Sequence, residues 1–270
     1  MIKSIVVHDL PIDWIPALER WYHRDHSPEI ARRYGPWLER HESYIPLDVP
    51  ADARAFGFYN WRVTECFWRE LPKPGPQGAL SFTPPPVWFS RVATCLVPPQ
   101  PTEDFLGFDC IPSEKVGLRW YILLRYPTGV PWEEGERWFL DVFAPEVARQ
   151  PTLYRFFSYQ VLRGGGASDG GQGPGVHELG LLPGTWRPGD GGPAETRLDR
   201  VLELWYETFS DWRASIIQQP PRYTVPTWAT SDIFPFVRPY EDFVSSSSLN
   251  GRMMSFSGIC AHICPEDRSL

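Results

Sequence analysis

The feature that most constrains the fold is a segment that occurs twice in the chain. Residues 20–44 read RWYHRDHSPEIARRYGPWLERHESY, and residues 137–159 read RWFLDVFAPEVARQPTLYRFFSY. Both open with Arg-Trp, carry Pro-Glu and Ala-Arg at the same spacing and close with Ser-Tyr. VVHDLP and ILLRYP precede the two copies, and Trp61 and Trp68 downstream parallel Trp205 and Trp212. An ordered match of three blocks predicts an internal duplication.

The two copies differ in their titratable groups. Where the first copy has Tyr22, His23 and His26, the second has Phe, Leu and Phe. Similar chemistry would be expected in both copies if both only built structure. The difference therefore predicts that the first copy holds a reactive site and the second completes the scaffold.

Composition limits the classes of function. The chain has 270 residues, enough for two domains of about 135. Aromatic residues make up 15% and include 13 Trp, which favours a pocket for a flat, apolar ligand. A net charge of −7 without a basic run argues against a nucleic-acid partner. No apolar stretch has the roughly 20 residues of a membrane helix, and no signal peptide is evident, so we expect a cytoplasmic protein without a membrane partner.

The five cysteines are scattered and odd in number, which is typical of reduced thiols in a cytoplasmic chain. The cluster CAHIC at residues 260–264 lacks the spacing of a zinc site. His23, His26 and Glu29 could together bind zinc or iron, but no second ligand cluster supports this. We therefore expect neither a metal nor a cofactor, although a lone axial His leaves haem open.

Residue patterns predict the order of the elements in both halves. Pro28 is expected to interrupt or kink the first helix, because it lacks an N–H donor. A proline-rich passage stands where a second helix would follow in the first half. The predicted elements are strand 3–9, helix 13–33 and strands 42–47, 55–67 and 87–97, then strand 116–126, helix 132–149, strands 153–162 and 198–209, helix 210–219 and strand 237–245.

Each half thus reads as a β-α-β-β-α-β, ferredoxin-like unit of the α+β class. The predicted domains are 1–114, which ends in a linker at 98–114, and 115–245, which contains a Gly-rich insertion at 163–198. Residues 246–270 form a C-terminal tail outside both units.

The block RDHSPEIARRYGPWLERHESY resembles a segment of EthD-type proteins in the dimeric α+β barrel superfamily, and VLELWYETFSDWRASI resembles their second signature. The resemblance implies two fused ferredoxin-like βαββαβ repeats that form an intrachain dimeric α+β barrel. The family's His corresponds to His26. Most such relatives are homodimers of single units, so a homodimer stays open as an assembly. Members of this superfamily include monooxygenases, polyketide cyclases, lactone isomerases, decarboxylases and haem-dependent enzymes.

The candidate catalytic residues are His26, His23, Tyr22 and Tyr44. The two histidines are three residues apart and can share one side of a helix, where an imidazole is suited to general acid–base catalysis. The tyrosines could donate a hydrogen bond to a developing phenolate or carbonyl oxygen. The alternatives are a surface histidine, a hydrogen-bonded helix-end histidine and ordinary core tyrosines.

The candidate substrate-binding residues supply rings and one cation. His41, four residues after Trp37, is expected to be exposed and is not part of this set. An arginine at the end of the helix could hold a carboxylate, although such residues are often solvated. The set is Tyr34, Trp37, Arg33, Tyr59 and Trp61.

These patterns predict a cofactor-independent lyase that acts on an aromatic small molecule by His/Tyr acid–base catalysis. The predicted step is carbon–carbon cleavage, such as decarboxylation or deformylation, or a related isomerisation or cyclisation. Two alternatives stay open: an oxygenase or haem-dependent enzyme on the same barrel, and a non-catalytic protein that binds aromatic ligands.

Overall fold

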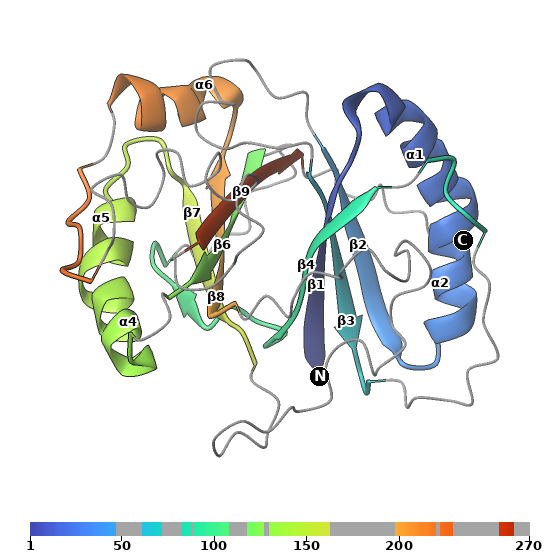
Figure 1. Ribbon diagram of the computed structural model, residues 1–270, viewed down its shortest axis with the longest axis horizontal. Helices are drawn as coiled ribbons and strands as arrows, with labels where there is room; N and C mark the ends of the chain where they lie inside the picture. The colour runs from blue at the N-terminus through green and yellow to red at the C-terminus, as the bar shows by residue number, and fades with distance from the viewer. Residues whose placement is uncertain are drawn as a thin grey trace. The chain divides into compact units, whose positions relative to one another are not determined.

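The computed structural model describes residues 1–46, 61–71, 83–87, 89–107, 118–126, 130–162, 198–219, 222–228 and 254–261. These residues group into two compact units, each with its own sheet and helices (Figure 1). The first unit contains residues 1–45, 61–100 and 161–162, and the second contains residues 46, 101–160 and 198–261, with the gaps just given. No helix among the described residues has the length and apolar character to cross a membrane. The α+β class predicted from the sequence is confirmed, whereas the barrel of two fused repeats stays a prediction.

The first unit contains a four-stranded antiparallel sheet with the order β4-β1-β3-β2. Its strands are β1 (Ile2–Asp9), β2 (Leu38–Pro46), β3 (Trp61–Trp68) and β4 (Ser90–Val97). In β1 the β-branched run Ile-Val-Val fits the half-buried surface of a sheet. Strand β2 is longer than the strand predicted at 42–47, because it already begins at Leu38, which pairs with Trp68 at the end of β3.

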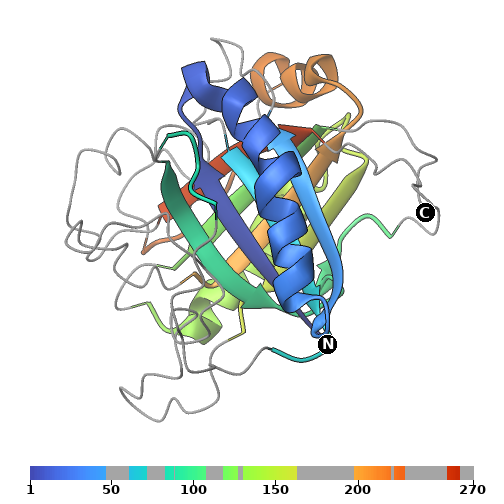
Figure 2. The same ribbon diagram turned by 90° about the vertical axis from the view of Figure 1, so that its right-hand side faces the viewer.

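One continuous helical segment of the first unit packs on one face of this sheet (Figure 2). It contains a 3-10 turn η1 (Ile12–Trp14), α1 (Ile15–Trp21), a π-helical turn η2 (Tyr22–His26) and α2 (Ser27–Tyr34). The N–H of Ser27 bonds to the carbonyl of Tyr22, five residues back. Pro28 therefore enters at the start of α2, where a missing N–H costs little. The α-helix is interrupted just before it, by the π-helical turn, while the helical segment continues.

The second unit contains an antiparallel sheet with the order β9-β6-β8-β7-β5. Its strands are β5 (Glu103–Asp104), β6 (Leu118–Arg125), β7 (Arg155–Gln160), β8 (Arg200–Tyr206) and β9 (Met254–Ala261). Two of these correct the sequence analysis. β5 lies in the predicted linker because it pairs with β7, and β9 lies in the predicted tail because it pairs along the whole of β6. The predicted strand at 237–245 lies outside the described residues, as does the predicted insertion up to residue 197.

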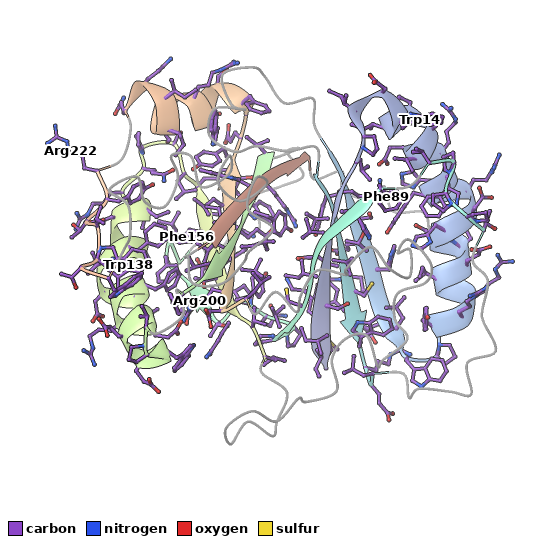
Figure 3. The ribbon with its side chains drawn as sticks, in the orientation of Figure 1. Trp14, Phe89, Trp138, Phe156, Arg200 and Arg222 are labelled. Atoms are coloured by element: carbon purple, nitrogen blue, oxygen red, sulfur yellow. The ribbon has the colours of Figure 1, made fainter. Side chains whose placement is uncertain are left out.

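The helices of the second unit are α4 (Trp132–Trp138), the π-helical turn η3 (Phe139–Phe143), α5 (Ala144–Val147), α6 (Phe209–Arg213) and the π-helical turn η4 (Ala214–Gln218). Thr208 caps α6 by accepting a hydrogen bond from the Asp211 N–H. The core between these helices and the sheet is apolar and densely aromatic, and includes Trp138 and Phe156 (Figure 3).

The helical segments of the two units are tied down by matching hydrogen bonds. Trp21 donates its indole N–H to the carbonyl oxygen of Thr83 at 2.9 Å, and the Glu29 carboxylate accepts from the N–H and hydroxyl of the same threonine. In the second unit, Trp138 donates to the carbonyl oxygen of Thr224 at 3.2 Å, and Glu146 accepts from the N–H and hydroxyl of that residue. Each helical segment therefore carries the same two attachments.

The downstream block of the repeat is in a different register from the one read in the sequence. Trp68 ends strand β3, whereas Trp212 lies in helix α6, so these two tryptophans are not equivalent. Arg62 and Arg200 instead occupy matching places, since each pairs with a glutamate two residues before the helix tryptophan. The sequence match paired the two tryptophans because Trp61 and Trp68 have the same spacing as Trp205 and Trp212, although Trp68 lies in a strand and Trp212 in a helix.

Candidate functional site: a histidine-lined cavity

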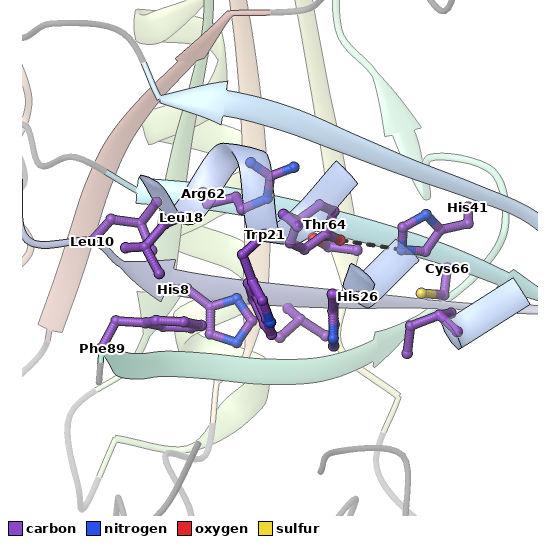
Figure 4. A pocket seen from close by; sticks show the side chains of 13 residues that line it. His8, Leu10, Leu18, Trp21, His26, His41, Arg62, Thr64, Cys66 and Phe89 are labelled. Carbon is purple, nitrogen blue, oxygen red and sulfur yellow. Dashed lines mark hydrogen bonds between the residues drawn. The ribbon is translucent and has the colours of Figure 1, made fainter. Parts of the chain in front are cut away.

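The first unit encloses a cavity of about 60 Å³ between its helical segment and its sheet (Figure 4). One part of its lining is apolar, and the other part carries imidazole, phenol, hydroxyl, thiol and guanidinium groups. The apolar lining residues are Val6, Leu10, Leu18, Trp21, Ile30 and Phe89. The polar lining residues are His8, Tyr22, His26, His41, Arg62, Thr64 and Cys66.

The strands place their polar side chains in the cavity by simple alternation. Successive residues of a strand point to opposite faces, so Arg62, Thr64 and Cys66 share the face that the helices cover. On the neighbouring strand β1, Val6 pairs with Thr64 and His8 pairs with Arg62. The floor of the cavity is therefore built from alternate positions of two paired strands.

His26 ends the π-helical turn, and its ring is held between two aromatic side chains. Its imidazole stacks on Trp21 with ring centroids 4.8 Å apart and lies 5.1 Å from the Tyr22 ring. Burial, reinforced by the positive charge of Arg62, lowers the pKa of His26 from 6.5 to about 4. At neutral pH this imidazole is uncharged and can accept a proton.

A second histidine faces the same cavity through Tyr22. The phenolic oxygen of Tyr22 lies 3.2 Å from His41 Nε2 and 2.9 Å from Thr64 Oγ1, both within hydrogen-bonding distance. Burial, followed by the charges of His26 and Arg62, lowers the pKa of His41 to about 4. The tyrosine hydroxyl thus sits between a neutral imidazole and a threonine hydroxyl, with His26 beside its ring.

Two further polar groups complete the lining. The Arg62 guanidinium lies over the Tyr22 ring at 3.5 Å from its centroid, and its Nη1 pairs with the carboxylate of Glu19. Burial raises the pKa of the Cys66 thiol to about 12, so this cysteine stays protonated and is a poor nucleophile. The cavity is therefore suited to proton transfer beside a fixed positive charge.

Two of the four residues predicted to be catalytic line the cavity, and the other two lie outside it. Tyr22 and His26 lie together in the cavity. The His23 side chain is 60% exposed and lies 3.5 Å from the Glu19 carboxylate, outside the cavity lining. Tyr44 is buried elsewhere, where its hydroxyl donates to Glu42 at 2.8 Å and to Glu65 at 3.1 Å. Alternation along the sheet puts it on the face opposite the cavity.

Three of the residues predicted to bind substrate, Tyr34, Trp37 and Arg33, have described side chains, and none of these three lines the cavity. Tyr34 packs edge-on against Trp68, and Trp37 is 37% exposed beyond the end of α2. Arg33 lies in α2 near enough to Glu29 to lower the pKa of that carboxyl group, after the larger effect of the hydrogen bond from Thr83. Tyr59 lies outside the described residues, as does the side chain of Trp61.

His41, Arg62 and Thr64 were not predicted as site residues, because each lies on a strand rather than in the repeated helix. His41 was expected to be exposed, yet it lines the cavity, because β2 begins earlier than predicted. The signal that could have found the others is the alternation R-V-T-E-C in residues 62–66, which places polar groups on one face.

The second unit carries apolar residues at the matching places. Phe139 and Phe143 stand where the first unit has Tyr22 and His26, and both are fully buried. Phe143 stacks on Trp138 with ring centroids 5.1 Å apart, as His26 does on Trp21. The same ring geometry therefore serves packing in one unit and a titratable group in the other.

No metal site is evident in the described part of the chain, because no group of three or more His, Cys, Asp and Glu side chains there could hold an ion. The predicted alternative of His23, His26 and Glu29 fails for this reason: these residues engage Glu19, the cavity and Thr83, respectively.

The geometry of the first unit thus brings two imidazoles, a phenol and a guanidinium together in a cavity with aromatic walls. Residues 1–79 match the family model of the chalcone isomerase N-terminal domain. That range contains every cavity residue except Phe89. No curated protein matches the chain. The predicted resemblance to EthD-type proteins finds no support in these comparisons, in which residues 1–79 match a different family model.

Proposed function

We propose that the cavity of the first unit is the active site of an enzyme that isomerises or cyclises an aromatic small molecule without a cofactor. The observation that carries the proposal is a neutral, half-buried imidazole beside a hydrogen-bonded phenol in an aromatic cavity. The similarity of residues 1–79 to a domain named after chalcone isomerase points to the same class of reaction. The proposed substrates are aromatic compounds in which a hydroxyl group can add to a conjugated ketone of the same molecule.

The reaction of a hydroxylated chalcone illustrates the chemistry. A base removes the phenolic proton, and the phenolate oxygen bonds to the β-carbon of the enone while the double-bond electrons move to the carbonyl oxygen. A proton then returns to the α-carbon, so the product has the same composition and no oxidant or reductant is needed. We assign the base to His26 and the hydroxyl that donates to the enolate oxygen to Tyr22.

The size of the cavity adds a requirement. Benzene binds in a protein cavity of roughly 150 Å³, which is larger than the 60 Å³ found here. A substrate ring therefore enters only if lining side chains move. Trp21 and Phe89 contact each other edge-on with ring centroids 6.1 Å apart and are the bulkiest apolar groups of the lining.

We further infer that the second unit is a duplicated, ferredoxin-like scaffold that lost or never held the chemistry. When the strands of each unit are numbered along the chain, leaving out β5, both sheets have the same strand order: fourth, first, third, second. The paired attachments of Trp21 and Trp138 also support this origin.

The test is a screen of hydroxylated chalcones and aromatic acids with metal-free protein, read by chromatography and mass spectrometry. A product of unchanged mass and new retention supports the proposal, provided that His26→Gln abolishes its formation. Loss of carbon dioxide or formaldehyde would instead support the lyase predicted from the sequence. Binding without chemical change would make the cavity a ligand-binding site, and either result would contradict an isomerase.

A further inference from the structure

Arg62 has hydrogen-bonding capacity that the described residues do not use. Its side chain lines the cavity and is 3% exposed. Nη1 pairs with Glu19, whereas Nε and Nη2, like the second oxygen of the Glu19 carboxylate, are buried without a hydrogen-bond partner in the described part of the chain. A guanidinium has five N–H donors in a planar fork, and leaving buried donors unpaired costs free energy.

Arg200, at the matching place in the second unit, indicates what such nitrogens bind. Its Nε donates to one oxygen of the Glu136 carboxylate at 2.8 Å, and its Nη2 donates to the other. Its Nη1 bonds to Glu103 and to Ser158. In this unit, the Nε–Nη2 edge of the arginine holds a whole carboxylate in the two-point geometry that guanidinium favours.

We infer that Arg62 binds the carboxylate of an acidic aromatic substrate through Nε and Nη2, as Arg200 binds Glu136. The inference rests on the proposed function for the aromatic part of the substrate. It narrows the substrate class from aromatic compounds to aromatic carboxylates whose acidic group reaches Arg62 while the reacting group lies at His26.

The electrostatics of the cavity favour an anionic ligand. The Arg62 charge lowers the pKa of both histidines. For His26 it is the largest cause after burial, and for His41 it follows burial and the charge of His26. An imidazole with a pKa of about 4 is a weak base toward a phenol, whose pKa is about 10. A carboxylate on Arg62 would offset the positive charge, raise the pKa of both histidines and so strengthen the base when substrate is bound.

The experiment compares anions with neutral amides of the same shape. Benzoate, benzamide, acetate and acetamide are titrated into the full-length protein by calorimetry. In ¹⁵N-labelled protein, the Nε–H resonance that Arg62→Met removes should shift with benzoate. Benzoate affinity should fall at least tenfold in Arg62→Met and stay within twofold in Arg24→Met, which removes an exposed arginine paired only with Asp25. The amides should bind at least tenfold more weakly than the anions.

A second variant keeps the test decisive if Arg62→Met fails to fold. Arg62→Met/Glu19→Gln avoids a stranded Glu19 carboxylate and should show the same loss. Equal binding of benzoate and benzamide, no binding of either anion, or unchanged affinity in the Arg62 variants would overturn the inference. Arg62-dependent binding of acetate without benzoate would preserve the anion site and contradict the aromatic substrate of the proposed function. Benzoate binding without any isomerised product in the screen would support the anion site and leave the proposed reaction refuted.

Discussion

At the scale of single residues, burial decides which histidine can do chemistry. His23 and His26 are three residues apart on one helical segment, and the sequence predicted a shared site. The structure exposes the first and half-buries the second against Trp21. Sequence could name Tyr22 and His26 because the second repeat replaces them with Phe. It could not name His41 or Arg62, because their position depends on strand pairing.

Replacing His26 tests the base directly. We expect His26→Gln to lower kcat/KM for the isomerisation by roughly 10² to 10⁴, the usual contribution of a general base. His23→Gln should change it by less than about threefold, because that imidazole lies outside the cavity. Steady-state kinetics measure both, with circular dichroism to confirm folding. Equal losses in the two variants would show that burial does not distinguish them.

The low pKa values of His26 and His41 also predict how stability depends on pH. Both groups have a folded-state pKa of about 4, below the usual 6.5. Between these values the unfolded chain takes up protons that the folded protein does not, so the free energy of unfolding falls as the pH drops from 6.5 toward 4.

Urea denaturation at a series of pH values measures this fall. We expect a weaker dependence on pH in His26→Gln/His41→Gln. His23→Gln is the matched control and should keep the wild-type dependence across the same window. A double variant with an unchanged slope would mean that neither imidazole is held neutral by burial.

At the scale of elements, periodicity predicted the helices and most strands, because their apolar spacing is local. β5 and β9 escaped prediction for a physical reason. β5 has two residues and exists only through its pairing with β7, and in β9 (MSFSGICA) the apolar residues do not alternate regularly with polar ones along the whole strand. The π-helical turns before Pro28 and Pro145 were also missed, since the proline indicates an interruption of the α-helix without showing its form.

Gly135 shows how closely helix α4 packs. A Cβ at this position would lie 2.5 Å from two carbons of the buried Tyr126 ring. Alanine normally stabilises a helix by about 1 kcal/mol relative to glycine, but overpacking a core costs about 1–3 kcal/mol.

We therefore expect Gly135→Ala to lower the free energy of unfolding, measured in urea. Glu133→Ala, at an exposed position of the same helix, should change it by less than about 0.5 kcal/mol. A more stable Gly135→Ala variant would mean that Tyr126 yields at little cost.

At the scale of the whole molecule, two units of similar construction differ in what fills the space between helices and sheet. The first unit has Tyr22, His26 and Thr64 around a cavity, and the second has aromatic and aliphatic residues in a packed core. Polar cavity linings reduce stability relative to apolar packing, and functional sites commonly carry such a cost. The sequence revealed this asymmetry through the repeat, although not the cavity itself.

Giving the first unit a residue of the second should exchange activity for stability. His26→Phe copies Phe143 and should abolish isomerisation while the free energy of unfolding stays unchanged or rises by about 1 kcal/mol. Kinetics and urea denaturation measure the two effects, and Phe143→Leu serves as a packing control with a loss of about 1 kcal/mol and little change in kcat/KM. Retained activity in His26→Phe would remove His26 from the mechanism.

The most direct measurement is a crystal structure of the protein with a bound flavanone or aromatic acid. We predict that the ligand lies in the first unit with a ring against Trp21 and an oxygen within hydrogen-bonding distance of His26. A ligand found only in the second unit, or on the opposite face of the first sheet beside Tyr44, would contradict a reactive cavity in the first unit.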